Sequence, residues 1–310
     1  MSAFVSGSIA YDTVLEYPGA FAGALGDGQG EIINITFEAA SLRRSYGGCG
    51  ANIACALKLL GGDPVLAGAV GYDGGDYLAR LEGLGIRHCV VKLDDVATAQ
   101  CFITADAAGA QIATFYPGAM LRSALARLPD EDFAAAIVAP DSKAGMLERA
   151  EELAARGLPF ILDISQAVGL FSRSELRHLL GLASMMILSG CEFQAFCRIA
   201  AMSPQDVAAR APALAVTHGA AGLEYWERGA HGTVPAASAP RIVDPVGAGD
   251  ALRGGLLYGL EAGAGLARSL RLGAALAALK VGYAGAQGCQ ASREDVLALY
   301  EKAYGEPFGA

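Results

Sequence analysis

The sequence predicts an α/β protein with a mainly parallel central sheet. Short apolar segments alternate with helical ones through the middle of the chain, and parallel strands joined by crossover helices produce this alternation. Strands are expected at 136–139, 159–163 and 185–188, with helices at about 146–156 and 174–182 between them. The chain has 310 residues, of which 53% are apolar, so it can bury a substantial core.

The N-terminal part begins with the same alternation. Residues 3–9 predict a buried strand, and a strand at 65–70, a helix at 75–84 and a strand at 86–91 follow. Asp12 stands just past the first of these strands. Ligands bind beyond the carboxyl ends of the strands in open α/β sheets. Asp12 is therefore either a ligand-binding group or an ordinary loop or capping residue.

Two segments interrupt the alternation. Residues 31–37 carry apolar side chains at alternate positions, as a strand does, and residues 100–104 and 111–116 predict a hairpin. Additions of this kind often close over a site. We therefore expect a small β-sheet lid made from residues of about 14–46 and 97–118.

The composition limits the possible partners. With 23 basic and 32 acidic residues the net charge is −9, whereas nucleic-acid surfaces rely on clustered lysine and arginine. No charged segment precedes the first strand, and the most apolar late stretch is broken by a lysine, so neither a signal peptide nor a membrane span is expected. The seven cysteines form no C-x-x-C pair, which favours reduced thiols and a cytoplasmic protein.

A first glycine motif runs from Tyr46 to Ala54 and leads into an apolar-periodic helix. Gly47 and Gly48 let the backbone approach a ligand closely, and the helix N-terminus supplies unpaired N–H groups. The motif is not a dinucleotide-binding fingerprint, because the third glycine and the preceding apolar strand are missing. Asn52 is either a hydrogen-bonding group for a polyol or a capping or turn residue.

A second glycine motif spans residues 242–251, where an apolar strand is expected to end, three small residues turn, and a helix begins near Asp250. Gly247, Ala248 and Gly249 are small enough to gather their N–H groups into an anion-binding nest, to which the helix adds its positive end. Asp250 at the same place can accept a proton from an alcohol, which suits phosphoryl transfer to a hydroxyl. The alternative is that Asp250 only caps the helix.

Other phosphate-handling signatures are absent. None of the five lysines lies in a G-K-[ST] sequence, and neither the H-R-D nor the D-F-G motif of protein kinases occurs. The backbone, Mg²⁺ and an arginine are then the groups left to hold the phosphates.

The combination of Gly47, Gly48 and Asn52 with the run from Asp244 to Asp250, about 200 residues later, resembles the PfkB/ribokinase family of carbohydrate and nucleoside kinases. The resemblance covers nearly the whole chain. It implies one ribokinase-like domain over residues 1–310, a three-layer α/β/α structure with a β-sheet lid. Arg43 and Arg44, residues 116–120 and residues 253–259 look most like the bacterial adenosine or nucleoside kinases.

The resemblance also implies roles for individual residues. Asp250 would be the base and residues 247–249 the anion hole. Asp12, Gly47, Gly48, Asn52 and Tyr116 would bind the substrate, and Thr217, Gly219 and Gly222 would lie along ATP.

The metal-binding pattern departs from that of the family. Glu192 matches the glutamate of the family's N-x-x-E motif, which organises Mg²⁺ through water, but Ser189 stands where the asparagine is expected. Asp163 is then a candidate to compensate. Val246 replaces the threonine that is common before G-A-G-D, a smaller change because backbone atoms form the hole.

The function that we expect is ATP- and Mg²⁺-dependent phosphorylation of the 5′-hydroxyl of a nucleoside, with adenosine as the first candidate. The alternatives are a kinase of a free sugar such as ribose or fructose, and a non-catalytic sensor of nucleosides or sugars on the same fold. The lid decides between the acceptors, because a base needs an apolar or aromatic slot. Phe37, Phe102 and Tyr116 suit such a slot and equally suit a lid that packs on itself. The sequence leaves open whether the protein is a monomer or a homodimer.

Overall fold

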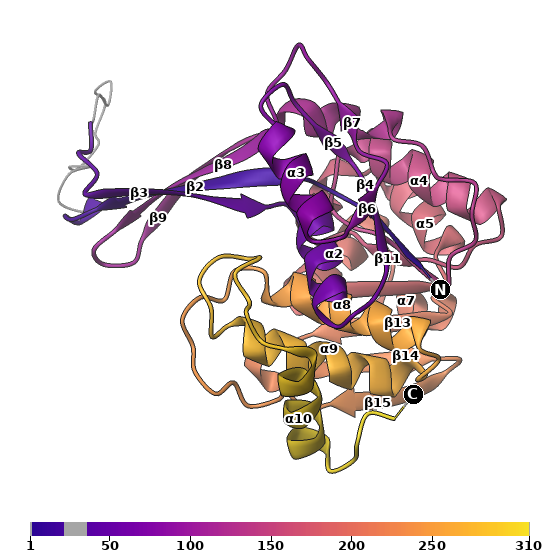
Figure 1. Ribbon diagram of the computed structural model, residues 1–310. Helices are drawn as coiled ribbons and strands as arrows, with labels where there is room; N and C mark the ends of the chain where they lie inside the picture. The colour runs from indigo at the N-terminus through magenta and orange to yellow at the C-terminus, as the bar shows by residue number, and fades with distance from the viewer. Residues whose placement is uncertain (1, 22–35, 310) are drawn as a thin grey trace.

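The computed structural model describes residues 2–21 and 36–309, and within these ranges its largest element is a nine-stranded sheet in the order β15-β14-β13-β12-β11-β10-β1-β4-β6 (Figure 1). Strands β6 to β13 of this order run parallel, and β14 and β15 add an antiparallel hairpin at one edge. The strands are β1 (Ala3–Ser6), β4 (Pro64–Ala67), β6 (Arg87–His88), β10 (Ala135–Val138), β11 (Ile161–Asp163), β12 (Met185–Ser189), β13 (Ala213–Thr217), β14 (Leu223–Glu227) and β15 (Ala230–Val234). The predicted mainly parallel sheet is confirmed.

Helices cover both faces of the sheet, so the fold has the three expected layers. Alternate strand residues face opposite layers: Phe4 and Val138 pack in one core, while Val5 and Ile137 pack in the other. The first core holds α4 (Lys143–Ala155), α5 (Arg173–Leu182), α6 (Gly190–Ala200) and α7 (Pro204–Arg210). The second holds α2 (Cys49–Leu59), α3 (Gly75–Gly83), α8 (Ala248–Glu261) and α9 (Leu266–Lys280), and α10 (Arg293–Tyr304) packs on α9. Burial on both faces explains why the parallel strands inside the sheet are mainly apolar, unlike the short edge strand β6.

A second, four-stranded sheet projects from this body as an arm (Figure 1). Its order is β3-β2-β8-β9, with β2 and β8 parallel and the outer pairs antiparallel. The strands are β2 (Ala10–Tyr17), β3 (Ser41–Gly47), β8 (Ala99–Asp106) and β9 (Gln111–Tyr116). This sheet is the lid, and it includes the predicted hairpin. The strand expected at 31–37 lies outside the described residues, except for Thr36 and Phe37, which belong to no strand.

Two predicted strands are divided between sheets. The segment 65–70 contributes β4 to the main sheet and β5 (Ala69–Val70) to a two-stranded sheet, and 86–91 contributes β6 and β7 (Val91–Lys92) in the same way. The division falls at Gly68, whose carbonyl accepts a hydrogen bond from Val91 N at 3.0 Å.

The start of each helix shows which helix termini remain open to a ligand. Serine side chains cap α5, α6, α7 and α10, and in each helix an acidic residue completes a reciprocal capping box. Gly247 caps α8 and offers no side-chain hydrogen bond. The N-terminus of α8 is therefore free to meet another group. Among the described residues, no helix is both long and apolar enough to cross a membrane.

Candidate active site

Asp250 and Asn52 belong to the two glycine motifs and are in direct contact. Asn52 Nδ2 donates a hydrogen bond to Asp250 Oδ2 at 2.8 Å, although 198 residues separate them in sequence. The contact forms because α2 packs on α8, where Gly254 has no side chain to keep the helices apart at Ala56. The two motifs therefore build one site.

The turn into α8 depends on Gly247, which has a φ of 81°. A side chain there would be strained, and its Cβ would lie 2.8 Å from Ala286. The apolar strand expected just before this turn is wrong. Ile242 and Val243 are 79% and 56% exposed and join no sheet, and Val243 N instead donates to Val281 O at 2.7 Å. Apolar character alone did not decide burial here.

The N–H groups at this turn can receive an anion. Across residues 2–21 and 36–309, the N–H groups of Gly247, Gly249 and Asp250 donate to no acceptor. The N–H of Ala248 differs, because it donates to Pro245 O at 3.1 Å. Free N–H groups and the positive end of a helix attract negative charge. The anion-binding nest was predicted from the N–H groups of residues 247–249. In the structure the free N–H groups are those of Gly247, Gly249 and Asp250.

Asp244 and Lys280 hold the loop in front of this turn. Asp244 accepts hydrogen bonds from Val246 N at 2.9 Å and from Gly285 N at 2.7 Å. Lys280 is only 1% exposed, and its Nζ donates to Asp244 O at 2.9 Å. A buried ammonium is stable only when such acceptors replace its water. The loop that carries the free N–H groups is therefore fixed from both of its sides.

The environment of Asp250 suits a proton acceptor. Burial raises the pKa of its carboxyl to about 6, while the hydrogen bond from Asn52 and the charge of Arg253 act in the opposite direction. A base works best when its pKa lies near the working pH. Asp250 is ionised at neutral pH and loses that state as the pH falls through about 6.

Behind Asp250, Arg253 and Asp163 form a buried ion pair. The guanidinium of Arg253 binds both oxygens of Asp163, with Nη2 to Oδ1 at 2.8 Å, and Asp163 is 1% exposed. Ser165 Oγ adds a hydrogen bond to Oδ1 at 2.6 Å, and Arg253 Nη1 donates to Gly249 O at 3.1 Å. Asp163 is therefore unsuited to the metal-binding role expected for it, because Arg253 already occupies both of its oxygens.

Asp12 lies at the base of the lid, under the first glycine motif. Its carboxylate is next to Gly47, where any Cβ would collide with it. Burial raises the pKa of Asp12 to about 6, with Arg43 lowering it and Asp244 raising it. Gly48 has a φ of 91°, and a Cβ there would lie 2.6 Å from the backbone oxygen of Ser8, so this position requires glycine. The motif thus brings bare backbone beside a carboxylate.

The register of the lid separates two neighbouring aromatic residues. Phe115 pairs with Cys101, which pairs with Asp12, so these side chains share one face of the lid. Tyr116 pairs with Gln100 in the next row and belongs to the opposite face. Phe115, rather than Tyr116, is therefore the aromatic residue of β9 on the face of the lid that holds Asp12, and the substrate-binding role of Tyr116 stays a prediction.

The other aromatic residues expected to form a slot are placed differently. Phe102 lies in the row beyond Cys101 and so shares the face of Tyr116. Phe37 packs against Tyr17 and Phe21, with ring centroids 4.8 and 5.0 Å away. This part of the lid packs on itself.

The expected ATP-binding residues follow the end of β13. Thr217 is the last residue of that strand, and it pairs with Ser189 at the end of β12. Gly219 and Gly222 lie at and just after the short helix η3 (Gly219–Ala221), with φ values of 58° and 93°. A Cβ on Gly219 would meet nothing within 4 Å, so open space lies beside this backbone. The segment lies at the carboxyl edge of the sheet, where ligands bind in open α/β folds.

Glu192 is the remaining candidate for metal binding. It caps α6 together with Ser189, whose N–H donates to Glu192 Oε2 at 2.7 Å. The described residues contain no group of three or more metal-ligating His, Cys, Asp or Glu side chains. Mg²⁺ in phosphoryl-transfer sites is typically held by one or two carboxylates, water and substrate phosphates. A single carboxylate at the start of α6, where the capping Ser189 pairs with Thr217, fits that kind of site.

Sequence reasoning missed three residues that shape the site: Arg253, Lys280 and Gln287. Arg253 and Lys280 are charged residues inside otherwise apolar helical stretches, which is a detectable signal of a buried polar role. Gln287 lies in a loop and has no sequence signal of this kind.

A proton acceptor beside free N–H groups, at the carboxyl edge of a parallel sheet and under a β-sheet lid, defines an enzyme that transfers an anionic group to a hydroxyl. The chain belongs to the pfkB family of carbohydrate kinases, whose model matches residues 23–293. It is accordingly a kinase, a phosphotransferase.

Solved and curated relatives agree with this assignment. The structure of Burkholderia thailandensis nucleoside kinase in complex with inosine is 38% identical, with a TM-score of 0.89 over 99% of both chains, and the same enzyme is solved with ADP-inosine. The nucleoside kinase of Methanocaldococcus jannaschii is 28% identical over 83% of this chain and 85% of its own length. The ribokinase of Thermotoga maritima shares the fold at 22% identity, with a TM-score of 0.79 over 97% of this chain and 99% of its own.

Proposed function

We propose that the protein transfers the γ-phosphoryl group of ATP to the 5′-hydroxyl of a purine nucleoside. The observation that carries the proposal is the contact between Asn52 and Asp250, which puts the polyol-binding motif against the proton acceptor. The inosine and ADP-inosine complexes of the Burkholderia thailandensis enzyme support a nucleoside acceptor and an adenine nucleotide donor. Adenosine and inosine are both candidate acceptors.

The roles of the residues follow from their positions. Asp12 accepts hydrogen bonds from the ribose hydroxyls, and Asp250 accepts the proton of the 5′-hydroxyl. A carboxylate is a modest base, but a loose transition state needs little proton removal before the phosphoryl group moves. The free N–H groups of Gly247, Gly249 and Asp250 stabilise the charge on the transferred group.

Mg²⁺, when bound with ATP, supplies positive charge to the phosphates, and Glu192 is the carboxylate proposed to hold it through water. Thr217, Gly219 and Gly222 are proposed to line the nucleotide.

The face of the lid that holds Asp12 favours a nucleoside over a free sugar. Phe115 is 50% exposed on that face, two strands from Asp12. Neighbouring strands lie roughly 4.8 Å apart, so Phe115 is about 10 Å from Asp12 across the sheet. A purine attached to a ribose held at Asp12 reaches this far, whereas a free sugar does not.

We expect ADP release at fixed Mg·ATP to be fastest with adenosine or inosine, slower with guanosine, and negligible with ribose and fructose. A coupled assay over these five acceptors measures it. A clear preference for ribose or fructose would contradict the nucleoside assignment. No turnover with any of them would favour the non-catalytic sensor or an acceptor outside these five.

The same assay on two neighbouring variants tests how the acceptor lies in the site. Phe115→Ala should raise KM for the nucleoside by about 5- to 100-fold, the scale of a lost aromatic stack on a base. Tyr116→Ala is the matched control, because it removes an aromatic ring from the other face and should leave KM within about twofold. A larger effect of Tyr116→Ala than of Phe115→Ala would contradict the proposal, because it would place the purine on the opposite face of the lid.

A further inference from the structure

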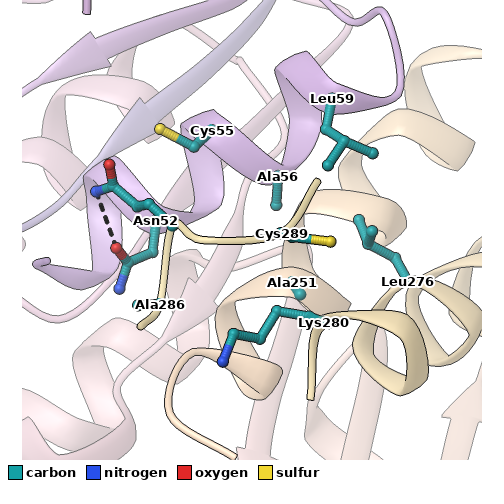
Figure 2. Close-up of a pocket in the computed structure, with 10 residues that line it drawn as sticks. Asn52, Cys55, Ala56, Leu59, Ala251, Leu276, Lys280, Ala286 and Cys289 are labelled. Carbon is teal, nitrogen blue, oxygen red and sulfur yellow. Dashed lines mark hydrogen bonds between the residues drawn. The ribbon is translucent and has the colours of Figure 1, made fainter. Parts of the chain in front are cut away.

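A directional hydrogen-bond chain reaches Asp250 from outside both glycine motifs. Gln287, in the segment between α9 and α10, donates from Nε2 to Asn52 Oδ1 at 3.0 Å, the dashed line in Figure 2. The same Nε2 donates to Tyr77 Oη at 2.6 Å. Tyr77, on α3, in turn donates to Gly47 O at 2.7 Å. Asn52 completes the chain by donating to Asp250.

The chemistry of the groups sets the direction of every bond. A backbone carbonyl only accepts, so the single proton of Tyr77 Oη goes to Gly47 O. Tyr77 must then accept from Gln287, which turns the NH₂ side of the Gln287 amide inward. That NH₂ faces Asn52 Oδ1, and the NH₂ of Asn52 consequently faces Asp250. Reversing either amide would bring two donors or two acceptors together.

The chain lies in an interior that keeps its members in place. Tyr77 is fully buried and Asn52 is 7% exposed. A small cavity of about 40 Å³ lies beside Asn52 and Gln287, with Lys280 on its far side (Figure 2). This volume holds no more than a few water molecules. Asn52 and Tyr77 are thus held away from bulk solvent, and Gln287 is half-buried beside them.

We propose that Gln287 is a positioning residue for the phosphoryl-transfer reaction: by orienting the amide of Asn52, it keeps a hydrogen-bond donor on the carboxylate of Asp250. The inference rests on the proposed role of Asp250 as the base. Gln287 itself touches neither the carboxylate nor the expected place of the substrate hydroxyl.

Other charged and titratable groups also affect the pKa of Asp250, and substitutions at Gln287 or Tyr77 leave them in place. Arg253 lies on the same helix, Asp163 ends β11, Cys49 begins α2 and Lys280 ends α9. Arg253 lowers the pKa of Asp250 and Asp163 raises it. Arg80 faces residue 287 itself, because its Nε donates to Gln287 Oε1 at 3.5 Å. Gln287→Leu adds no charge and therefore isolates the contribution of the amide chain, whereas Gln287→Glu adds the effect of a new negative charge.

The test is the pH profile of kcat/KM for Gln287→Glu and Gln287→Leu. In the wild type, activity should fall as the pH drops through about 6, where both Asp250 and the substrate-binding Asp12 become protonated, and the Asp250 part of this limb is the one that should respond to residue 287. A carboxylate at 287 accepts instead of donating, so Asn52 turns its NH₂ toward residue 287 and its oxygen toward Asp250. The acid limb of Gln287→Glu should rise by about one to two pH units, the equivalent of one hydrogen bond to a charged group.

Gln287→Leu removes the donor without reversing the amide, so its limb should rise by less than that of Gln287→Glu. Gln290→Glu is the matched control, because Gln290 is exposed in the same segment and should leave the limb unchanged. Tyr77→Phe provides a second route, since it frees the Gln287 amide and should move the limb in the same direction.

An acid limb that stays at the wild-type pH in Gln287→Glu, Gln287→Leu and Tyr77→Phe would overturn the proposal, even if these variants unfold at a lower temperature. Failure of the proposed function looks different: Asp250→Asn would then retain wild-type turnover. Should Gln287→Glu not fold, the limbs of Gln287→Leu and Tyr77→Phe decide the question.

Discussion

Asp250→Asn should lower kcat by about 10²–10⁴-fold while nucleoside and nucleotide binding stay measurable. The substitution keeps the size of the side chain and removes its ability to take the proton of the acceptor hydroxyl. Steady-state turnover and equilibrium titration with nucleoside measure the two effects separately.

Asp295→Asn is the matched control for this variant. Asp295 is the third residue of α10, as Asp250 is of α8, but it only completes a capping box with Ser292. If Asp250 were merely a helix-capping residue, both variants would lose a little stability and neither would lose turnover. Near-wild-type turnover of Asp250→Asn would remove Asp250 from its role as the base.

Arg253→Met should lower the free energy of unfolding by about 3–5 kcal/mol, the usual cost of leaving one member of a buried ion pair alone. Asp163 is 1% exposed, and among the described residues Ser165 would be its one remaining side-chain partner. The bond from Arg253 to Gly249 O would also be lost, which loosens the turn that carries the free N–H groups. Urea denaturation gives the free energy directly.

The double variant Arg253→Met with Asp163→Asn separates charge from packing. Removing the stranded carboxylate should recover a large part of the lost stability, because the remaining groups are neutral. A single variant that loses less than about 1 kcal/mol would show that the pair is not the buried support that its geometry indicates.

The local parts of the site were readable in the sequence because they are short. Gly48 and Gly247 have positive φ and close backbone contacts, and Gly47 leaves room for the carboxylate of Asp12; such needs leave a local mark in the sequence. The strand and helix alternation of the central part gave the main sheet for the same reason, since each strand there is apolar on both faces.

The parts that were missed depend on contacts between distant segments. Gln287 and Asn52 are hydrogen-bonded although 235 residues separate them in sequence, and Arg253 and Asp163 are separated by 90 residues. No local pattern encodes such a meeting. The face of the lid on which Tyr116 lies was also not readable, because a shift of one residue along a strand exchanges the two faces of a sheet. The strand predicted at Ile242 and Val243 was wrong because burial of an apolar segment depends on which other segments cover it, and these two residues are exposed.

The lid and Asp250 are connected through the first glycine motif. Tyr77 fixes the backbone at Gly47 beside Asp12, and through Gln287 and Asn52 the same tyrosine is connected to Asp250. We therefore expect an acceptor bound at Asp12 to present its hydroxyl to a carboxylate that is already oriented.

The most direct test of this account is the position of the phosphate in the product. Proton-coupled ³¹P NMR of the product formed from inosine or adenosine with Mg·ATP should show coupling to the two 5′ protons of the ribose, because Asp250 receives the proton of the 5′-hydroxyl. Coupling to a single ribose proton would place the phosphate on the 2′- or 3′-oxygen. That result would contradict the arrangement of Asp12, Asn52 and Asp250 proposed for this enzyme.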